Sequence, residues 1–171
     1  MDFRFLPPDL RQLDLATAEL LACCIWSDIR PVRGLAGLLD FRLAGKLSRL
    51  SRESFLGGAR GEVVLVPGRP RFPFDKVLVF GLGSRSDFSD AVYATSVKHM
   101  SRALEELLVA RAVVELPGRA DGAVAPERAA ELLVASIGSD AHDTWWLVED
   151  LEAQRAMEPK LQRDRRSLRR A

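Results

Sequence analysis

The chain has 171 residues, of which 47% are apolar and 29% are charged, and its formal net charge is +1. This length fits one domain with a core of its own, and the composition is that of an ordinary globular protein, which excludes the compositionally biased classes. The net charge alone indicates no class of partner.

The first two predicted elements are strands. Residues 3–6 alternate partly between apolar and charged side chains, which predicts a short edge strand that ends at the prolines at 7 and 8. The segment Leu20–Trp26 is the longest unbroken apolar run; its leucines and alanine also suit a helix, but its short length favours a buried strand, which is our interpretation. At seven residues it is too short to cross a bilayer, so we expect no membrane association.

The two cysteines, Cys23 and Cys24, are adjacent and lie inside this apolar run. They provide neither the spacing of a metal site nor a disulfide framework, which favours a reducing compartment. The start of the chain also lacks the hydrophobic core of a signal peptide. We therefore expect a cytoplasmic protein.

Leucines recur at helical spacing between residues 35 and 50, with charged residues on the other faces. This pattern predicts one amphipathic helix that ends at Gly57-Gly58. The leucine positions are 35, 39, 43, 47 and 50.

Two short runs at the middle of the chain, Val63–Val66 and Val77–Phe80, are apolar at every position. Such runs are typical of strands covered on both faces in the middle of an α/β sheet. Residues 67–75 lie between them and contain three prolines, which predicts a loop. The second run leads into Gly81-Leu82-Gly83 and then into an amphipathic helix with acidic residues in its first turn. This strand, glycine turn and helix form the expected centre of the fold.

The remaining elements alternate. We expect a helix through residues 93–108, a strand at 112–116, a helix at 127–137 capped by Gly138, and a strand at 145–148. The resulting order β-α-β-β-α-β-α-β predicts an α/β domain with a mixed, mostly parallel sheet. We place this domain at residues 1–150 and a charged, basic tail, broken at Pro159, at residues 151–171.

The glycine turn is also a candidate site for an anion or a nucleotide. It offers the first two glycines of a dinucleotide-binding pattern, but Ser86 stands at the third position. An acidic residue at a strand end is first found at Glu115, 32 residues beyond Gly83. We therefore favour a tight structural turn and keep anion or nucleotide binding as the alternative interpretation. The candidate cofactor-binding residues are Gly81, Gly83, Ser84 and Arg85.

The sequence predicts no catalytic residue, no metal site and no cofactor. His99 lies within a predicted helix, and no acidic residue or cysteine stands four positions away, so we expect a surface or boundary side chain. His142 lies between Asp140 and Asp143, but two carboxylates and one imidazole do not complete a metal site. No serine stands in a nucleophile-elbow pattern.

The end of the chain is basic. Residues 160–171 carry a net charge of +5, which fits either a solvated terminus or a surface for an acidic partner or nucleic acid. Because few apolar residues are present there, we expect deletion of 160–171 to leave the melting temperature nearly unchanged. The basic residues are Lys160, Arg163, Arg165, Arg166, Arg169 and Arg170.

Five segments, in their order and spacing, carry a resemblance to a known family. They are RGLAGLLD at 33–40, GKLSRL at 45–50, FLGG at 55–58, GE at 61–62 and VLVFGLG at 77–83. Over about residues 13–150 the chain resembles the N-terminal domain of the leucyl (cytosol) aminopeptidase family. The resemblance implies a macro-like, three-layer α/β/α sandwich, which in that family precedes a separate catalytic domain with two metal ions.

The catalytic signature of that family contains an asparagine, and this chain has none. The chain ends where the linker to the catalytic domain would begin. We therefore expect a non-catalytic, stand-alone relative that acts through contacts with a protein partner or through self-association. The alternative is an ADP-ribose or nucleotide-binding module that uses the Gly81-Leu82-Gly83 turn.

Overall fold

The computed structural model describes residues 2–137 and 143–168. Its centre is a six-stranded sheet of order β1-β6-β5-β2-β4-β3. The strands are β1 (Asp2–Leu6), β2 (Leu20–Ile25), β3 (Val63–Pro67), β4 (Lys76–Gly81), β5 (Arg111–Val114) and β6 (Thr144–Val148). All neighbouring strands run parallel except β3, which is antiparallel to β4.

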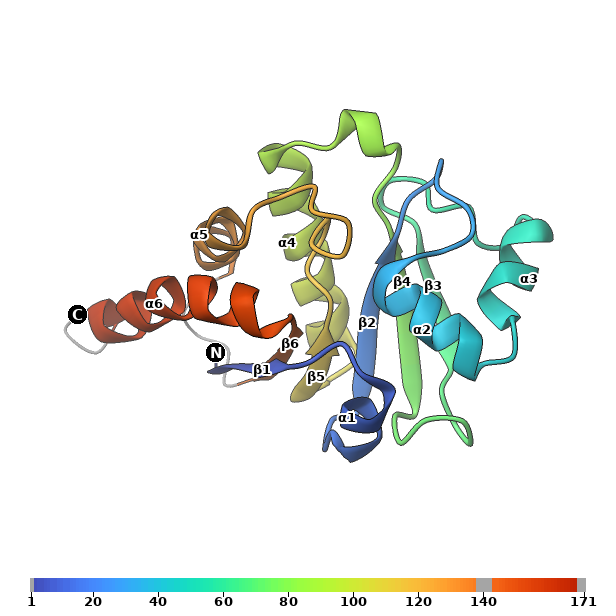
Figure 1. Cartoon of the computed structure of the whole chain (residues 1–171), viewed down its shortest axis with the longest axis horizontal. Helices are drawn as coiled ribbons and strands as arrows, with labels where there is room; N and C mark the ends of the chain where they lie inside the picture. Colours follow the sequence, from blue (N-terminus) through green and yellow to red (C-terminus); the bar gives the residue numbers. More distant parts are fainter. Residues whose placement is uncertain (1, 138–142, 169–171) are drawn as a thin grey trace.

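Helices cover both faces of the sheet and complete a three-layer α/β/α sandwich (Figure 1). The helices are α1 (Leu10–Leu15), α2 (Gly34–Arg42), α3 (Lys46–Arg52), α4 (Asp90–Glu106), α5 (Pro126–Ser136) and α6 (Leu151–Leu168), with one 3-10 turn, η1 (Arg85–Asp87). Buried side chains of α1, α2 and α3 lie in the core on one face, and those of α4, α5 and α6 lie in the core on the other. The mixed, mostly parallel sheet expected from the sequence is confirmed.

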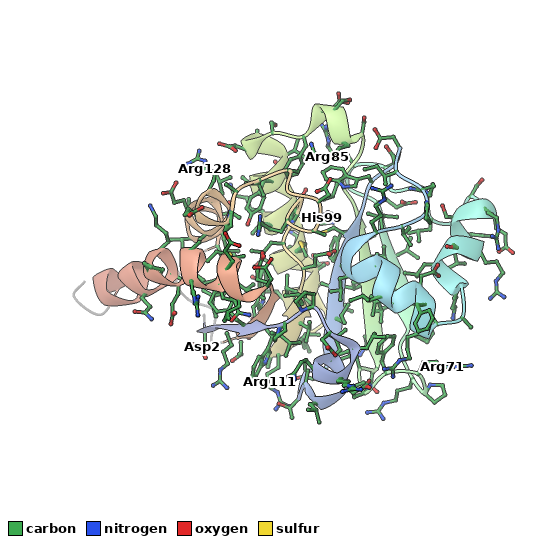
Figure 2. All side chains as sticks on the ribbon, viewed as in Figure 1. Asp2, Arg71, Arg85, His99, Arg111 and Arg128 are labelled. Carbon is green, nitrogen blue, oxygen red and sulfur yellow. The ribbon has the colours of Figure 1, made fainter. Side chains whose placement is uncertain are left out.

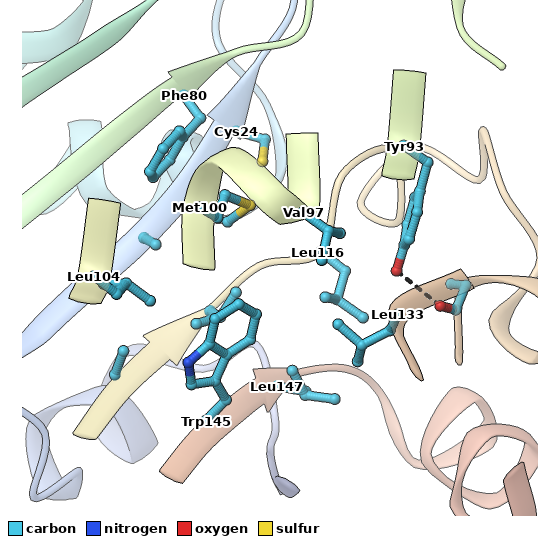
Figure 3. Close-up of a cluster of buried hydrophobic side chains, with 14 of the residues drawn as sticks. Cys24, Phe80, Tyr93, Val97, Met100, Leu104, Leu116, Leu133, Trp145 and Leu147 are labelled. Carbon is cyan, nitrogen blue, oxygen red and sulfur yellow. Dashed lines mark hydrogen bonds between the residues drawn. The ribbon is translucent and has the colours of Figure 1, made fainter. Parts of the chain in front are cut away.

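The core on the α4 side is built around large side chains from the sheet and the helices (Figure 3). Trp145 and Tyr93 are fully buried there, and the Tyr93 hydroxyl donates a hydrogen bond of 2.8 Å to the carbonyl oxygen of Ala129. This contact satisfies the one polar atom that Tyr93 brings into the core. It also ties α4 to α5.

The strand at 63–66 lies at an edge of the sheet, so the expectation of a strand covered on both faces was wrong for this run. The loop of residues 68–75 joins it to β4 as an antiparallel hairpin, and no further strand among residues 2–137 and 143–168 pairs with its outer side. As a result Leu65 is 54% exposed. The run at 77–80 is central and buried, as expected.

The single helix predicted from the leucine spacing is two helices. Ala44 and Gly45 adopt positive φ angles of 55° and 77°, which end α2 and start α3 in a new direction. The Asp40 carboxylate accepts from the backbone amide of Ser48 at 3.0 Å and from the Ser48 hydroxyl, and so supports the first turn of α3. The helical spacing of the leucines persists across the break between α2 and α3 because both helices pack on the same core, where Leu39 and Leu47 are fully buried.

Residues 151–168, expected as a tail broken at Pro159, form helix α6 with Pro159 inside it. Ala153, Met157 and Leu161 recur at a spacing of four and are buried, and Met157 and Leu161 belong to the core on the α4 side of the sheet. The packed core therefore extends past residue 150. The expected cap Gly138 lies outside the described residues.

Candidate functional site

A cleft opens at the carboxyl ends of β2, β4 and β5. The helix after β2 covers one face of the sheet and the helix after β4 covers the other, so these neighbouring strands form a topological switch point. The cavity has a volume of about 350 Å³, and its walls include Trp26, Arg33, Arg85, Glu115 and Asp121. Open α/β sheets bind ligands at this position, which makes the cleft the candidate site.

The cleft wall contains a buried carboxylate, Glu115, which follows β5 and is 4% exposed. Its Oε2 atom accepts from the backbone amide of Cys24 at 2.9 Å, and its Oε1 atom accepts from that of Leu35 at 2.8 Å. Leu35 belongs to the first turn of α2, where free amides and the helix dipole attract an anion. Glu115 therefore supplies that anion from within the chain.

Burial raises the pKa of Glu115 to about 7, because a charged carboxylate loses its hydration in the protein interior. The two amides of Cys24 and Leu35 oppose this rise, and the negative charges of Glu149 and Asp121 add to it. The side chain thus changes charge near neutral pH.

The glycines of the predicted anion turn have structural roles, Gly81 through close backbone packing and Gly83 through its positive φ angle. A Cβ atom at Gly81 would overlap the carbonyl oxygen of Ala59. Gly83 has a φ angle of 81°, its amide donates to the carbonyl oxygen of Gly58 at 2.9 Å, and its own carbonyl oxygen accepts from Ser27 at 2.9 Å. The turn thereby joins the end of β4 to the segments that follow β2 and precede β3.

The amide that this turn could offer to a ligand is already bonded to Asp28. The Asp28 carboxylate accepts from the backbone amide of Arg85 at 3.0 Å and from the Ser84 hydroxyl at 2.7 Å. The hydrogen bond from the Ser84 hydroxyl, and then that from the Arg85 amide, lower the pKa of Asp28. At the turn, as at α2, a carboxylate of the chain occupies the position of an external anion.

Arg85, labelled in Figure 2, lines the cleft, and its partly exposed side chain is held by two contacts within the chain. Its Nε atom donates to Asp121 at 2.6 Å, and its guanidinium lies 5.6 Å from the centre of the Trp26 ring. The charge of Arg85 is therefore largely balanced inside the protein.

Of the four predicted cofactor-binding residues, the structure places only Arg85 in the cleft wall, together with Glu115, whereas Gly81 lines a separate groove. The structure also adds Asp28, which sequence reasoning missed because Asp28 is 57 residues from Arg85. One feature of the sequence could have found it. Asp28 follows β2 as Ser84 follows β4, and the carboxyl ends of adjacent parallel strands meet at one edge of the sheet.

A second buried carboxylate closes a neighbouring cavity of about 230 Å³. Arg119 and Glu149 form a two-pronged ion pair, with Nε to Oε1 and Nη2 to Oε2 both at 2.9 Å. Burial raises the pKa of Glu149, and the charge of Arg119 opposes this rise. The pair ties the loop after β5 to the end of β6.

The cysteines and His99 lie in surroundings that do not favour catalysis or metal binding. Both cysteine thiols are buried and free, and burial raises the pKa of each, which disfavours a reactive thiolate. Within residues 2–137 and 143–168 no group of three or more histidine, cysteine or acidic side chains could hold a metal ion. His99 is half-buried with its ring edge-on to Phe80 at 5.8 Å, whereas His142 lies outside the described residues.

The basic end of the chain is only partly described. Lys160 forms an ion pair with Glu131 of α5, so its charge is used within the domain. The side chains of Arg163, Arg165 and Arg166 lie outside the described residues, as do Arg169 and Arg170 entirely. In the described helices, none combines the length and apolar character needed to span a bilayer.

Comparison with known proteins supports the fold and identifies a family. The model of the cytosol aminopeptidase family, N-terminal domain, matches residues 27–143. A probable cytosol aminopeptidase of Halorhodospira halophila is 35% identical over 82 residues, which cover 48% of this chain and 16% of that protein. The chain thus matches only about a sixth of the length of that relative.

Solved structures show the same fold. A tomato leucine aminopeptidase mutant matches with a TM-score of 0.63 and 20% identity, over 94% of this chain and 35% of that one. A macrodomain of Oceanobacillus iheyensis, solved with ADP, matches with a TM-score of 0.68 and 11% identity, over 89% of this chain and 87% of that one. At these identities the likeness concerns the fold alone.

Proposed function

The chain belongs to the cytosol aminopeptidase family through its N-terminal domain, and we propose that this domain is a non-catalytic module that acts through protein contacts. The observation that carries the proposal is the pair of carboxylates, Glu115 and Asp28, at the two positions where backbone amides could hold a ligand phosphate. A cytosolic location, as the name of the Halorhodospira halophila relative indicates for that protein, is part of the same proposal.

The two carboxylates oppose a nucleotide both sterically and electrostatically. A phosphate at the start of α2 would have to displace Glu115 from two hydrogen bonds shorter than 3 Å. A phosphate at the glycine turn would face Asp28, whose lowered pKa keeps it ionised at neutral pH. The repulsion is stronger at Glu115, which is buried, than at Asp28, which lies at the surface where water screens its charge.

The surface offers features that suit contact with a protein. Strand β3 is an open edge of the sheet, and open edges can pair with an extended segment of another chain. Leu65 on this strand is 54% exposed, and Phe41 and Phe55, at the ends of the helices on the other face, are 80% and 69% exposed. Exposed aromatic and aliphatic side chains are common anchors of protein interfaces.

The contact role is tested by capture of partners from native lysate on immobilised protein. We expect Leu65→Arg to abolish capture, whereas Leu15→Arg, on α1 and 75% exposed, serves as the matched control and retains it. Equal capture by both variants, or none by the wild type, would contradict the proposal.

The absence of catalysis is tested separately with a leucine-linked chromogenic substrate and added manganese or zinc. We expect no turnover above a blank that contains the metal alone. Turnover that a chelator removes would overturn the proposal.

A second candidate is a nucleotide-binding module, favoured by the cleft of about 350 Å³ at the switch point and by the fold shared with a macrodomain solved with ADP. Calorimetry with ADP-ribose, NAD and ATP separates the two functions. We expect no binding heat at millimolar ligand. A micromolar affinity that Gly83→Val abolishes, in a variant with an unchanged circular dichroism spectrum, would instead support the nucleotide module.

A further inference from the structure

A second groove lies away from the cleft, between helix α4 and the turn that precedes β3. It has a volume of about 370 Å³, and Phe80, Gly81 and Val92 contribute to its apolar floor. One side of α4 lines it from Val92 to Arg102, a rise of about 15 Å along the helix axis. The groove is therefore long enough for four or five residues of an extended chain.

The rim of this groove is positive. Arg60, Lys98 and Arg102 line it together with His99, and no carboxylate among the described residues does. The three cations are exposed, and none of them forms an ion pair within residues 2–137 and 143–168. In contrast, Arg85 and Arg119 beside the other two cavities are each paired with a carboxylate.

The apolar floor continues to the open edge of the sheet. Val63 lies opposite Phe80, and Leu65 lies opposite Leu78, in the antiparallel register of β3 and β4. Residues that pair in this way point to the same face, so Leu65 lies on the α4 side of the sheet. An apolar strip thus runs from the groove to the exposed side chain of Leu65.

The chemistry of the groove favours carboxylates over nucleic acid. Stacking of bases needs an open aromatic face, but the Phe80 ring is 2% exposed and meets the edge of His99. The Gly61 amide is already bonded to the carbonyl oxygen of Gly81, so it is not free for a phosphate. What remains is a set of flexible cations above an apolar floor.

From this arrangement we propose that the groove binds an extended acidic segment of a partner protein, an inference that rests on the protein-contact role proposed above. Alternate side chains of an extended chain point to opposite sides, so apolar residues would face the floor of the groove while acidic residues reach the rim. Lys98 and Arg102 are one helical turn apart, about 6 Å, which matches two acidic residues separated by one position in a strand.

The test is fluorescence anisotropy with a labelled ten-residue peptide of alternating Glu and Val. We expect saturable binding that weakens as salt is added, because three exposed cations carry it. The combined variant Arg60→Glu, Lys98→Glu and Arg102→Glu should lose at least tenfold in affinity. Circular dichroism and the melting temperature report whether the variant is folded, and single substitutions replace it if it is not.

A charge-matched control places the same three reversals on the elements that cover the other face of the sheet, as Arg11→Glu, Arg52→Glu and Arg71→Glu. We expect its affinity to stay within twofold of the wild type. Equal loss in both variants, or no binding of the peptide by the wild type at millimolar concentration, would overturn the proposal.

Two further probes separate the classes of partner. A peptide of alternating Lys and Val should not bind. A labelled ten-residue oligothymidine that binds as tightly as the acidic peptide, and through the same three cations, would identify a nucleic-acid site and overturn the proposal. If capture depends on Leu65 but the acidic peptide does not bind, the proposed binding of an acidic segment in the groove is wrong, whereas the protein-contact role is still supported.

Discussion

The buried carboxyl of Glu115 should make the stability of the domain depend on pH in a defined direction. Its pKa rises from the ordinary 4.5 to about 7 on folding, chiefly through burial. Below pH 4.5 the group is protonated in the folded and unfolded states, and its stabilising contribution is fully present. Between pH 4.5 and about 7 only the unfolded state loses the proton, so the free energy of unfolding falls as the pH rises.

The size of this effect follows from the pKa difference. Each pKa unit corresponds to about 1.4 kcal/mol, so Glu115 alone should lower the free energy of unfolding by about 3 kcal/mol between pH 4 and pH 8. The substitution Glu115→Gln removes the titration. It also places an NH₂ group opposite the backbone amide of Cys24 or of Leu35. The lost hydrogen bond should lower the free energy of unfolding by about 1–3 kcal/mol at every pH.

The measurement is urea unfolding of the wild type and Glu115→Gln across this pH range. As the pH rises, the free energy of unfolding of the wild type should fall by about 3 kcal/mol relative to that of Glu115→Gln. As a control, Glu62→Gln replaces another carboxylate that accepts from two amides, those of Gly57 and Gly58, at a half-buried position. A difference for Glu115→Gln that stays constant with pH would refute the reasoning.

Three further substitutions, with Gly61→Ala as a control for the first, test the packing, each by its melting temperature and urea midpoint. Gly81→Ala should destabilise by about 3 kcal/mol or more, because its Cβ atom meets backbone, whereas Gly61→Ala, with open space around it, should cost only about 1 kcal/mol. Leu161→Ala should cost about 2–3 kcal/mol, since the side chain is 6% exposed; an unchanged melting temperature would show that α6 is not packed. Arg119→Ala should cost about 3–5 kcal/mol at neutral pH and less in acid, where the stranded Glu149 can protonate; an equal loss at both pH values would contradict the ion pair.

The expectation that deletion of residues 160–171 leaves the melting temperature unchanged conflicts with the position of Leu161. That side chain belongs to the core on the α4 side of the sheet. Pro159 predicted a break in the chain, whereas Met157 and Leu161 on either side of it are buried. Packing on α5 and on the sheet outweighs the hydrogen bond that a proline removes.

The sequence predicted the strands well because their apolar runs are short and bounded by prolines, glycines or charged residues. The run at 20–26 was ambiguous by period, yet its length and bounds were sufficient, and it is the central strand β2. The position of β3 at the edge was not predictable from its composition. Val63–Val66 is as apolar as Val77–Phe80, and only the pairing order decides which of the two runs is covered.

The candidate site was predicted in part. The glycine turn was found from its spacing, and its interpretation as a tight structural turn agrees with the backbone contacts of Gly81 and Gly83. The roles of Asp28 and Glu115 depend on contacts across 57 and 91 residues of sequence, and no local pattern encodes such contacts. The positive groove likewise joins Arg60 to residues of α4 that follow more than thirty positions later.

The most direct test of the account is to map two ligands on the isotope-labelled protein by amide chemical shifts in solution NMR. The acidic peptide should shift the amides of Gly61, Lys98 and Arg102, while ADP-ribose at millimolar concentration should leave the amides of Leu35 and Arg85 unchanged. Saturable shifts of Leu35 and Arg85 with ADP-ribose, and none in the groove with the peptide, would show that the domain holds a nucleotide in its cleft and would contradict the account.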